Sequence, residues 1–215
     1  MLLSFDTATS LVSVALHDGH EVVAERLSEL PMKHGEQLAP LIEAVITDSG
    51  LVRQDLTAIA VGVGPGPFTG LRVGLVTART LGFVLDIPIY GVCTLDVIAI
   101  EAIDTGAVRG DFLVATDARR KEVYLAAYDD LGRRLDGQVV STPAAVASGL
   151  PVAGEGARLY PESFPNAVTP TRPSAGWLAR VVAEERAELL DPDPLYLRRP
   201  DAVANTPRKP VLPGA

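Results

Sequence analysis

The hydrophobic pattern of this chain starts twice, and this repetition limits the folds that it can adopt. Alternating apolar residues predict three antiparallel strands within residues 2–24, and the first of these strands ends at Asp6. A second group of three strands is predicted within 112–141, and its first strand ends at Asp117. Because both groups are followed by helical patterns, the sequence predicts an α/β protein of two stacked lobes.

The two lobes are placed at 1–108 and 109–198, the second being abbreviated. Apolar residues make up 47% of the 215 residues, which is enough for a sizeable core. A helix predicted over 174–190 would complete the second lobe. The remaining residues, 199–215, are rich in proline and are expected to be poorly ordered.

An apolar helix with a row of small residues is the strongest local feature. A short buried strand at 58–61 leads through a Gly/Pro-rich loop, 62–70, into a helix over 71–85. Hydrophobic residues on nearly every side predict that this helix is buried all round. Glycine inside a helix costs roughly 1 kcal/mol against alanine, so close packing must compensate for it. The small residues at four-residue spacing are Gly70, Gly74, Ala78 and Gly82.

A second apolar helix, around 38–45, comes earlier in the same lobe. Two such helices are difficult to cover within a small lobe, so an intermolecular interface is favoured over burial inside the chain alone. The predicted interface residues are Leu38, Leu41, Ile42, Val45, Gly70, Gly74, Thr77, Ala78 and Leu81.

The loop 62–70 also has the form of an anion site, because glycine-rich turns before helices expose backbone N–H groups. No Gly-Lys-Ser/Thr follows, so it is not a Walker A loop, and Pro65 and Pro67 remove two donors. A rigid structural turn is therefore favoured over an anion site. For the acid and hydroxyls after the first strand, side-chain hydrogen bonds that stabilise a turn are likewise favoured over phosphate binding. A vestigial phosphate loop would comprise Asp6, Thr7, Thr9, Gly64, Gly66 and Thr69.

No catalytic set, metal site or cofactor site is predicted. His34 has no second histidine one helical turn along, which disfavours a metallohydrolase. The net charge of −8 lacks the basic surplus of an autonomous nucleic-acid binder, so a partner would supply phosphate contacts to RNA. The single cysteine, Cys93, allows no internal disulfide, and no signal peptide or membrane-length apolar run is evident. A cytoplasmic location without membrane contact is expected.

Four segments together resemble a known family. Residues 5–9, 64–74, 117–124 and 196–198 occur in this order, and the second contains Gly-Pro-Gly-Pro-Phe-Thr-Gly-Leu-Arg. The combination resembles the TsaB (YeaZ) family of the bacterial threonylcarbamoyl-adenosine pathway, over residues 2 to about 199. The family usually has serine where this chain has Pro67, which weakens any phosphate-binding role for the loop.

The resemblance implies two ribonuclease-H-like lobes of the actin/Hsp70/sugar-kinase type with mixed sheets flanked by helices. It implies a non-catalytic scaffold that pairs through its first two helices with a TsaD-like catalytic subunit, or with a second copy. With a TsaE-like ATPase, such an assembly modifies the adenosine next to the anticodon of ANN-decoding tRNAs, so tRNA would be contacted indirectly. The alternatives are a sugar-kinase-type phosphotransferase that uses Asp6 and residues 64–69, and a metallopeptidase-like enzyme.

Overall fold

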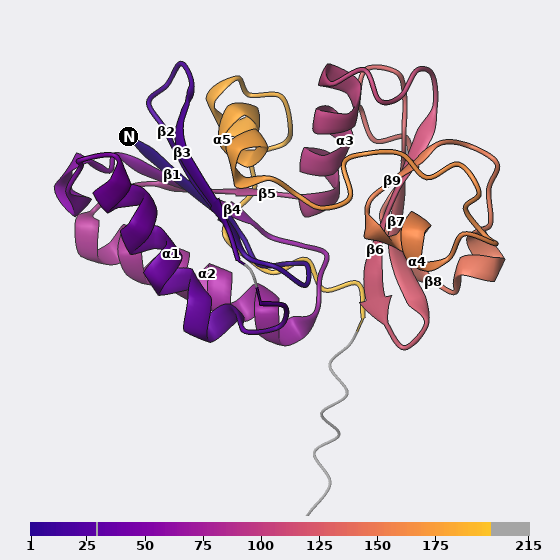
Figure 1. The fold of residues 1–215 in the computed structure, drawn as a ribbon, viewed down its shortest axis with the longest axis horizontal. Helices are drawn as coiled ribbons and strands as arrows, with labels where there is room; N and C mark the ends of the chain where they lie inside the picture. The colour runs from indigo at the N-terminus through magenta and orange to yellow at the C-terminus, as the bar shows by residue number, and fades with distance from the viewer. Residues whose placement is uncertain (29, 199–215) are drawn as a thin grey trace, which may run out of the picture.

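The computed structural model describes residues 1–28 and 30–198, and it contains two β-sheets flanked by helices (Figure 1). The two-lobed α/β architecture expected from the repeated strand pattern is confirmed. The predicted tail, 199–215, lies outside the described residues.

The first sheet has five strands in the order β3-β2-β1-β4-β5. β1 is antiparallel to β2 and parallel to β4, and β2 is antiparallel to β3, so the predicted three-strand opening is confirmed. The strands are β1 (Leu2–Asp6), β2 (Ser13–His17), β3 (Val22–Leu27), β4 (Ala58–Gly62) and β5 (Ile89–Val92).

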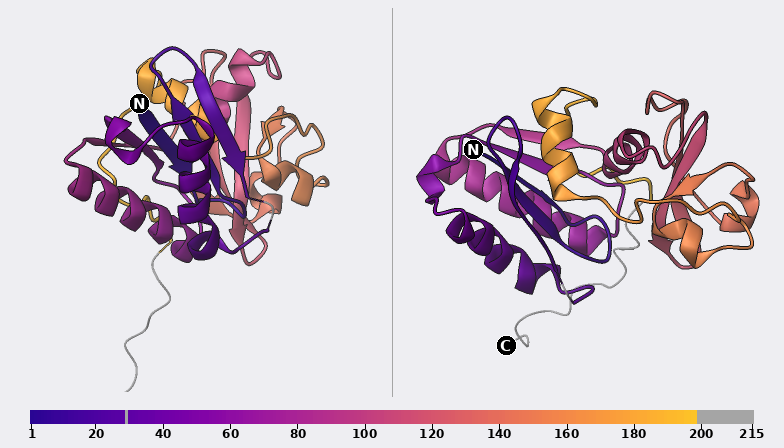
Figure 2. Two further views of the ribbon diagram at one scale, coloured as in Figure 1. Left: turned by 60° about the vertical axis from the view of Figure 1, so that its left-hand side comes forward. Right: turned by 45° about the horizontal axis from the view of Figure 1, so that its top comes forward.

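Helices cover both faces of this sheet (Figure 2). α1 (His34–Asp48) and α2 (Phe68–Leu85) lie on one face, and α5 (Ala175–Ala183) lies on the other. The alternation of β1 explains this layering, because successive side chains of a strand point to opposite faces. Leu3 and Phe5 join the core under α1 and α2, whereas the hydroxyl of Ser4 donates to the Ala175 carbonyl of α5 at 2.7 Å.

The second sheet has four strands in the order β8-β7-β6-β9. α3 follows β5 and packs on this sheet, so it joins the two lobes. The elements are α3 (Thr94–Asp104), β6 (Phe112–Arg119), β7 (Glu122–Tyr128), β8 (Val139–Ser141), β9 (Val152–Ala153) and α4 (Glu155–Leu159). Two 3-10 turns, η1 (Arg53–Asp55) and η2 (Pro143–Val146), complete the described chain.

The C-terminal helix is shorter than predicted and belongs to a different sheet. The sequence placed a helix over 174–190 in the second lobe, whereas α5 ends at Ala183 and packs on β1 and β2 of the first sheet. Glu25 of β3 explains this position. Its Oε1 accepts hydrogen bonds from the Ser174 hydroxyl at 2.8 Å and the Gly176 N–H at 3.1 Å, which anchors the start of α5 to the first lobe.

Two local expectations from the sequence also need correction, for the strand before Ser141 and for the N-cap of α3. The strand expected over 134–141 is reduced to β8, and Arg134 forms only an isolated bridge with Tyr128. α1 contains Pro40 in its interior. Thr94 was expected to cap α3, but its hydroxyl donates to Asp6 instead and the N-cap position is Cys93.

The segment 190–198, here called the strap, connects the first sheet to the second lobe. Leu190 pairs with Gly91 of β5, and the N–H of Leu195 donates to the Val63 carbonyl at 2.9 Å. Tyr196 stacks on Phe68 of α2 with 5.4 Å between ring centroids. Arg198 then forms an ion pair with Glu122 of β7. The strap thus holds the start of α2 against the boundary between the lobes.

Candidate protein-interaction site

The acid at the end of β1 is committed to the fold. Asp6 is buried, and its Oδ1 accepts the N–H of Ala8 at 2.7 Å while its Oδ2 accepts the Thr94 hydroxyl at 2.7 Å. Burial raises the pKa of the Asp6 carboxyl, and these two hydrogen bonds oppose that rise by favouring the charged form. The turn chemistry favoured from the sequence is therefore what the structure contains.

The glycine-rich loop is packed against this turn. A Cβ added to Gly66 would lie 2.4 Å from the Ala8 carbonyl, and one added to Gly62 would lie 1.8 Å from Oδ2 of Asp6. The hydroxyl of Tyr124, from β7, donates to the Gly66 carbonyl at 3.4 Å. Gly64 is buried as well. These contacts support a rigid structural turn, since the backbone that would cradle an anion is occupied by protein.

The hydroxyl-bearing residues of the proposed phosphate loop do not converge. Thr9 is buried and its hydroxyl donates to the Leu11 carbonyl at 3.5 Å, whereas Thr69 is exposed on the first turn of α2. Thr7 is buried, and its hydroxyl has no hydrogen-bond partner among the described residues. It lies against Gly74, where an added Cβ would be 2.4 Å from Oγ1.

His34 fastens the β1–β2 loop to α1. It is buried at the first position of that helix, and its Nε2 is 2.7 Å from the Thr9 carbonyl, which accepts the hydrogen bond. Within residues 1–28 and 30–198, no group of three or more His, Cys, Asp or Glu side chains has the arrangement of a metal site.

The small residues of α2 face the chain's own sheet. A Cβ at Gly70 would lie 2.6 Å from the Thr7 carbonyl, and one at Gly82 would lie 2.6 Å from the Ile89 side chain. Ala78 is fully buried. The close approach expected for this row therefore occurs within the chain, where the compensating contacts are made with Thr7 of the β1–β2 loop and Ile89 of β5.

The predicted interface residues divide into two sets by burial. Six are buried in the chain's own core and three are half-buried at the edge of α1 or α2. The buried ones are Leu38, Ile42, Val45, Gly70, Gly74 and Ala78, and the half-buried ones are Leu41, Thr77 and Leu81. The second set reaches the surface, and of the first set Ile42 lines a groove that a partner could contact.

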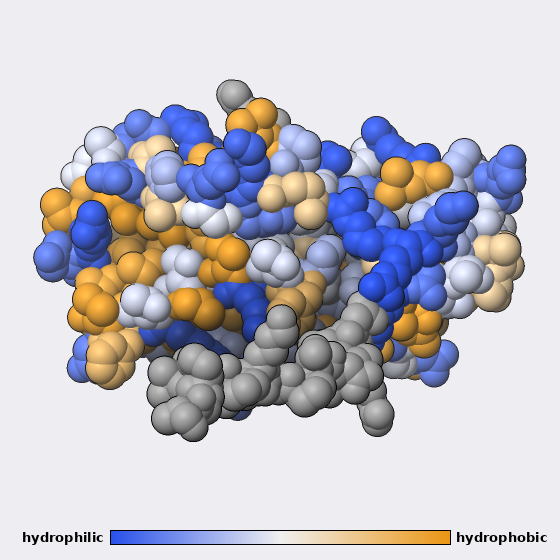
Figure 3. Space-filling model, turned by 90° about the horizontal axis from the view of Figure 1, so that it is seen from below, coloured by the Kyte–Doolittle hydropathy of each residue, from blue (hydrophilic) through white to orange (hydrophobic). Residues whose placement is uncertain are grey.

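The outer side of α2 carries large apolar side chains that the chain leaves uncovered. Val76 is 62% exposed, Phe83 is 89% exposed and Val84 is 69% exposed. The prediction that α2 is buried all round is therefore wrong, because its own sheet covers only the side with the small residues. Figure 3 shows hydrophobic residues gathered on this side of the first lobe. We call Val76, Phe83 and Val84 the outer stripe.

α2 is also the only helix in the described part of the chain that is long and apolar enough to cross a membrane. Its composition has another explanation, because the glycine side packs closely on the sheet and Arg72 and Arg79 interrupt the apolar run. Both arginines are engaged by the strap. Arg72 donates to the Tyr196 hydroxyl at 3.0 Å, and Arg79 forms an ion pair with Asp193. We interpret α2 as a sheet-covering helix with one open side.

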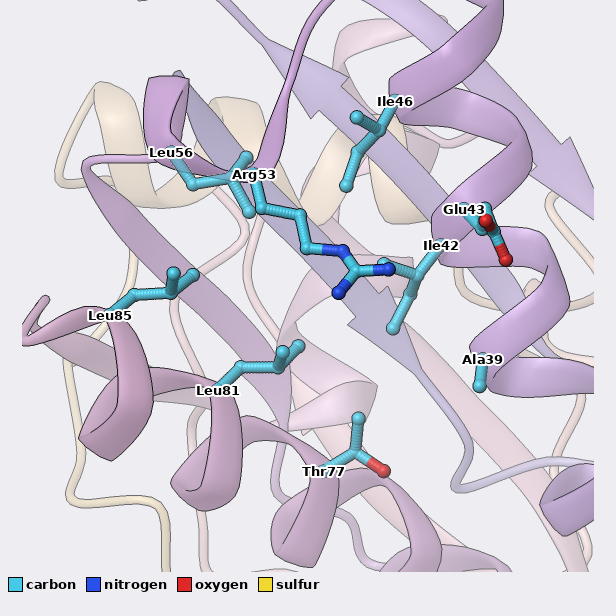
Figure 4. Close-up of a pocket in the computed structure, with 9 residues that line it drawn as sticks. All are labelled: Ala39, Ile42, Glu43, Ile46, Arg53, Leu56, Thr77, Leu81 and Leu85. Carbon is cyan, nitrogen blue, oxygen red and sulfur yellow. The ribbon is translucent and has the colours of Figure 1, made fainter.

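Two hollows border the outer stripe. A groove of about 180 Å³ lies between α1 and α2 (Figure 4), and a hollow of about 470 Å³ lies on the N-terminal half of α2. Thr77 lines both, so the two hollows meet at this residue. The groove is lined by Ala39, Ile42, Glu43, Ile46, Arg53, Leu56, Thr77, Leu81 and Leu85.

Phe83 and Arg53 lie on this surface but were not predicted from the sequence. The signal for Phe83 is its seven-residue spacing from Val76, which puts both on one side of the helix, away from the glycine row. Arg53 carries no such signal, because a short turn between a helix and a strand has no periodicity.

Comparisons with known proteins agree with these features. Residues 28–175 match the model of the family described as TsaD, tRNA N6-adenosine threonylcarbamoyltransferase. An uncharacterised protein of Mycobacterium tuberculosis is 44% identical over 206 residues, which cover 94% of this chain and 93% of the relative. The tRNA threonylcarbamoyladenosine biosynthesis protein TsaB of Escherichia coli is 40% identical over 129 residues, which cover 59% of this chain and 54% of that protein.

Among solved structures, YeaZ from Pseudomonas aeruginosa superposes with a TM-score of 0.76 at 30% identity, covering 91% of this chain and 99% of that one. A second structure, of a Pseudomonas aeruginosa protein described as similar to peptidase YEAZ, gives the same TM-score at 31% identity and covers 92% and 99%. The match therefore extends over both lobes at family-level identity. This chain belongs to the TsaB (YeaZ) family.

Proposed function

We propose that this chain is a subunit of the assembly that makes N6-threonylcarbamoyladenosine next to the anticodon of ANN-decoding tRNAs. In this assembly it binds a TsaD-like catalytic subunit and carries no active site of its own. The named relatives in Escherichia coli and Bacillus subtilis support the pathway, because both are described as tRNA threonylcarbamoyladenosine biosynthesis proteins.

The outer stripe is the observation that carries the scaffold role. Three large apolar side chains on one side of a helix, bordered by two hollows, form the kind of patch that marks a protein–protein interface. A partner that covers them removes apolar area from water, which stabilises the complex by about 25 cal/mol per Å². The proposed interface therefore moves from the buried glycine row to the outer stripe, with Leu41, Thr77 and Leu81 at its edge.

The packing of the strand-end loop supports a non-catalytic role. Both carboxylate oxygens of Asp6 accept hydrogen bonds from the protein, and Gly66 is in contact with Ala8. A sugar-kinase-type phosphotransferase would need these groups free for phosphate and magnesium. The chain would instead act by binding the competent conformation of the catalytic subunit more tightly than its other conformations.

The remaining assignments follow from this role. A TsaE-like ATPase would join the same assembly, and tRNA would contact the partner subunits. The modification of tRNA would take place in the cytoplasm. A homodimer through the outer stripe would compete with the catalytic subunit, because both would cover the same side chains.

Depletion of the protein followed by mass spectrometry of tRNA nucleosides tests the pathway. The expected result is loss of threonylcarbamoyladenosine, restored by the wild-type chain and not by a Phe83→Asp variant. Undiminished threonylcarbamoyladenosine would contradict the proposal. Stoichiometric binding of ATP with magnesium by the isolated chain would support the phosphotransferase instead, and a retained stoichiometric metal would support the metallopeptidase.

A further inference from the structure

An arginine lies over the apolar groove between α1 and α2. Arg53 begins the turn η1, and its side chain extends across the groove toward Ile42 (Figure 4). Ile42 and Ile46 of α1 form one wall, and Leu81 and Leu85 of α2 form the other. A partner that fills this groove with an apolar side chain must therefore also meet a guanidinium group.

The guanidinium of Arg53 forms no ion pair within the described part of the chain, although acids are close in sequence and space. Asp55 is engaged elsewhere, because its Oδ2 accepts the Val52 N–H at 2.8 Å. Glu43 lines the same groove but extends on the other side of Ile42. By contrast, Arg26 beside α1 is paired with Asp48 at 2.6 Å. Arg53 is thus an exposed cation at the candidate interface, with no carboxylate partner among residues 1–28 and 30–198.

We propose that the groove receives an apolar side chain of the TsaD-like subunit together with a neighbouring carboxylate, and that this carboxylate pairs with Arg53. The inference rests on the proposed function and deepens it, because it states the chemistry that the partner must present. Arg53 would be a specificity-determining residue of the interface.

Desolvation of the Arg53 guanidinium is the physical reason to expect a carboxylate in the partner. Covering the groove removes water from the guanidinium, and a charge that loses its water without a partner costs several kcal/mol. A carboxylate compensates for this loss, and the planar fork of arginine can form two parallel hydrogen bonds with it. A partner with an uncharged or basic residue at this place would lose affinity, so Arg53 selects among proteins that have a matching apolar side chain.

The continuity of the groove with the outer stripe supports one occupant for both. Thr77 lines the groove and also the hollow that contains Val76. A helix or helix pair laid along α2 would therefore contact the outer stripe and the groove together, with its carboxylate beside Ile42, where the guanidinium of Arg53 lies (Figure 4).

Calorimetric titration of the full chain with the TsaD-like subunit, at two salt concentrations, tests the inference. The variants are Arg53→Glu and Arg53→Met, and the matched control is Arg109→Glu, an exposed arginine on the loop before β6 with the same change in charge. We expect binding to weaken about 100-fold for Arg53→Glu and about tenfold for Arg53→Met, with Arg109→Glu within about twofold of the wild type. Arg53→Met should also show a smaller salt dependence.

The outcomes distinguish a failure of the Arg53 pairing from a failure of the proposed function. Unchanged affinity and salt dependence in Arg53→Met, with native circular dichroism, would overturn the inference and leave the outer stripe as the interface. If the wild-type chain does not bind the TsaD-like subunit at all, the proposed function fails and the inference fails with it. Preferential loss of self-association in the Arg53 variants would assign the carboxylate to a second copy and overturn the proposal.

Discussion

The two sides of α2 differ in what they contact, although both are apolar. The inner side carries Gly70, Gly74 and Gly82, and each lies where an added Cβ would clash with the β1–β2 loop, with Ile89 or with its neighbours. The outer side carries Val76, Phe83 and Val84, which the chain leaves exposed. The comparison shows that small residues bring α2 close to its own sheet, whereas large residues at the surface are available to another protein.

The inner side should be the more sensitive to small changes in volume. Gly70→Ala places a Cβ 2.6 Å from the Thr7 carbonyl, which is backbone and cannot rotate away. We expect the free energy of unfolding to fall by about 2–3 kcal/mol, as for other overpacked sites. Urea denaturation measures this. The matched control is Gly35→Ala in the first turn of α1, where nothing lies within 4 Å and a gain of up to about 1 kcal/mol is expected.

Substitutions on the outer side of α2 should change the affinity for the TsaD-like subunit and leave the free energy of unfolding nearly unchanged. Phe83→Asp is expected to weaken binding to the TsaD-like subunit about 100-fold, because an aspartate would be buried without a partner. Its free energy of unfolding should stay within about 0.5 kcal/mol of the wild type, since Phe83 is 89% exposed. Leu131→Asp, at a 61% exposed position on the β7–β8 turn, is the control. Equal binding by both variants would remove the distinction between the two sides.

A substitution at Thr7 tests whether the inner side of α2 is held by apolar packing alone. Its buried hydroxyl has no hydrogen-bond partner among residues 1–28 and 30–198, so Thr7→Val replaces it with a group of the same shape and no unmet polar atom. We expect thermal denaturation to show a gain of about 1 kcal/mol. A loss of similar size would indicate that the hydroxyl is engaged in the native protein, and the inner side would then have a polar role.

The pH dependence of stability provides a further test, at a carboxyl group of α3 that lies near Glu25 and Arg180. Burial raises the pKa of Glu101 on α3 to about 7, with the charge of Glu25 adding to the rise and Arg180 opposing it. The folded state therefore binds this proton more tightly than the unfolded state, and stability is lost as pH rises from about 4.5 to about 7. Glu101→Gln should flatten this slope and raise stability at pH 8 by about 0.5–1 kcal/mol, because partial exposure reduces the effect. An unchanged slope in the variant would contradict the assignment.

The strands and helices of the first lobe could be predicted because their patterns are local. Alternation placed β1 to β3, and the small-residue row correctly indicated close packing of α2. The sheet on which α5 packs could not be predicted, because Glu25 and Ser174 meet only after folding. The same limit applies to Thr94, since its hydroxyl turns to Asp6 rather than to its own helix.

The placement of an interface on α1 and α2 stays a prediction, and the sequence could name these elements more readily than the residues that reach their surface. Periodicity identified α1 and α2 as apolar, but it could not say which side the sheet would take. Glycine at four-residue spacing fits a neighbour within the chain or outside it equally well. The contact of Gly74 with Thr7 decides the question, and it joins residues that are far apart in the sequence.

Protection of the outer stripe in the complex tests the central claim most directly. A Val84→Cys variant gives one reactive thiol, because Cys93 is buried and burial raises the pKa of its thiol to about 12. Maleimide labelling of this chain, followed by mass spectrometry, should slow at least about tenfold when the TsaD-like subunit is bound, whereas labelling of a Leu131→Cys control should not change. Equal labelling rates for Val84→Cys with and without a bound subunit would show that the partner sits elsewhere.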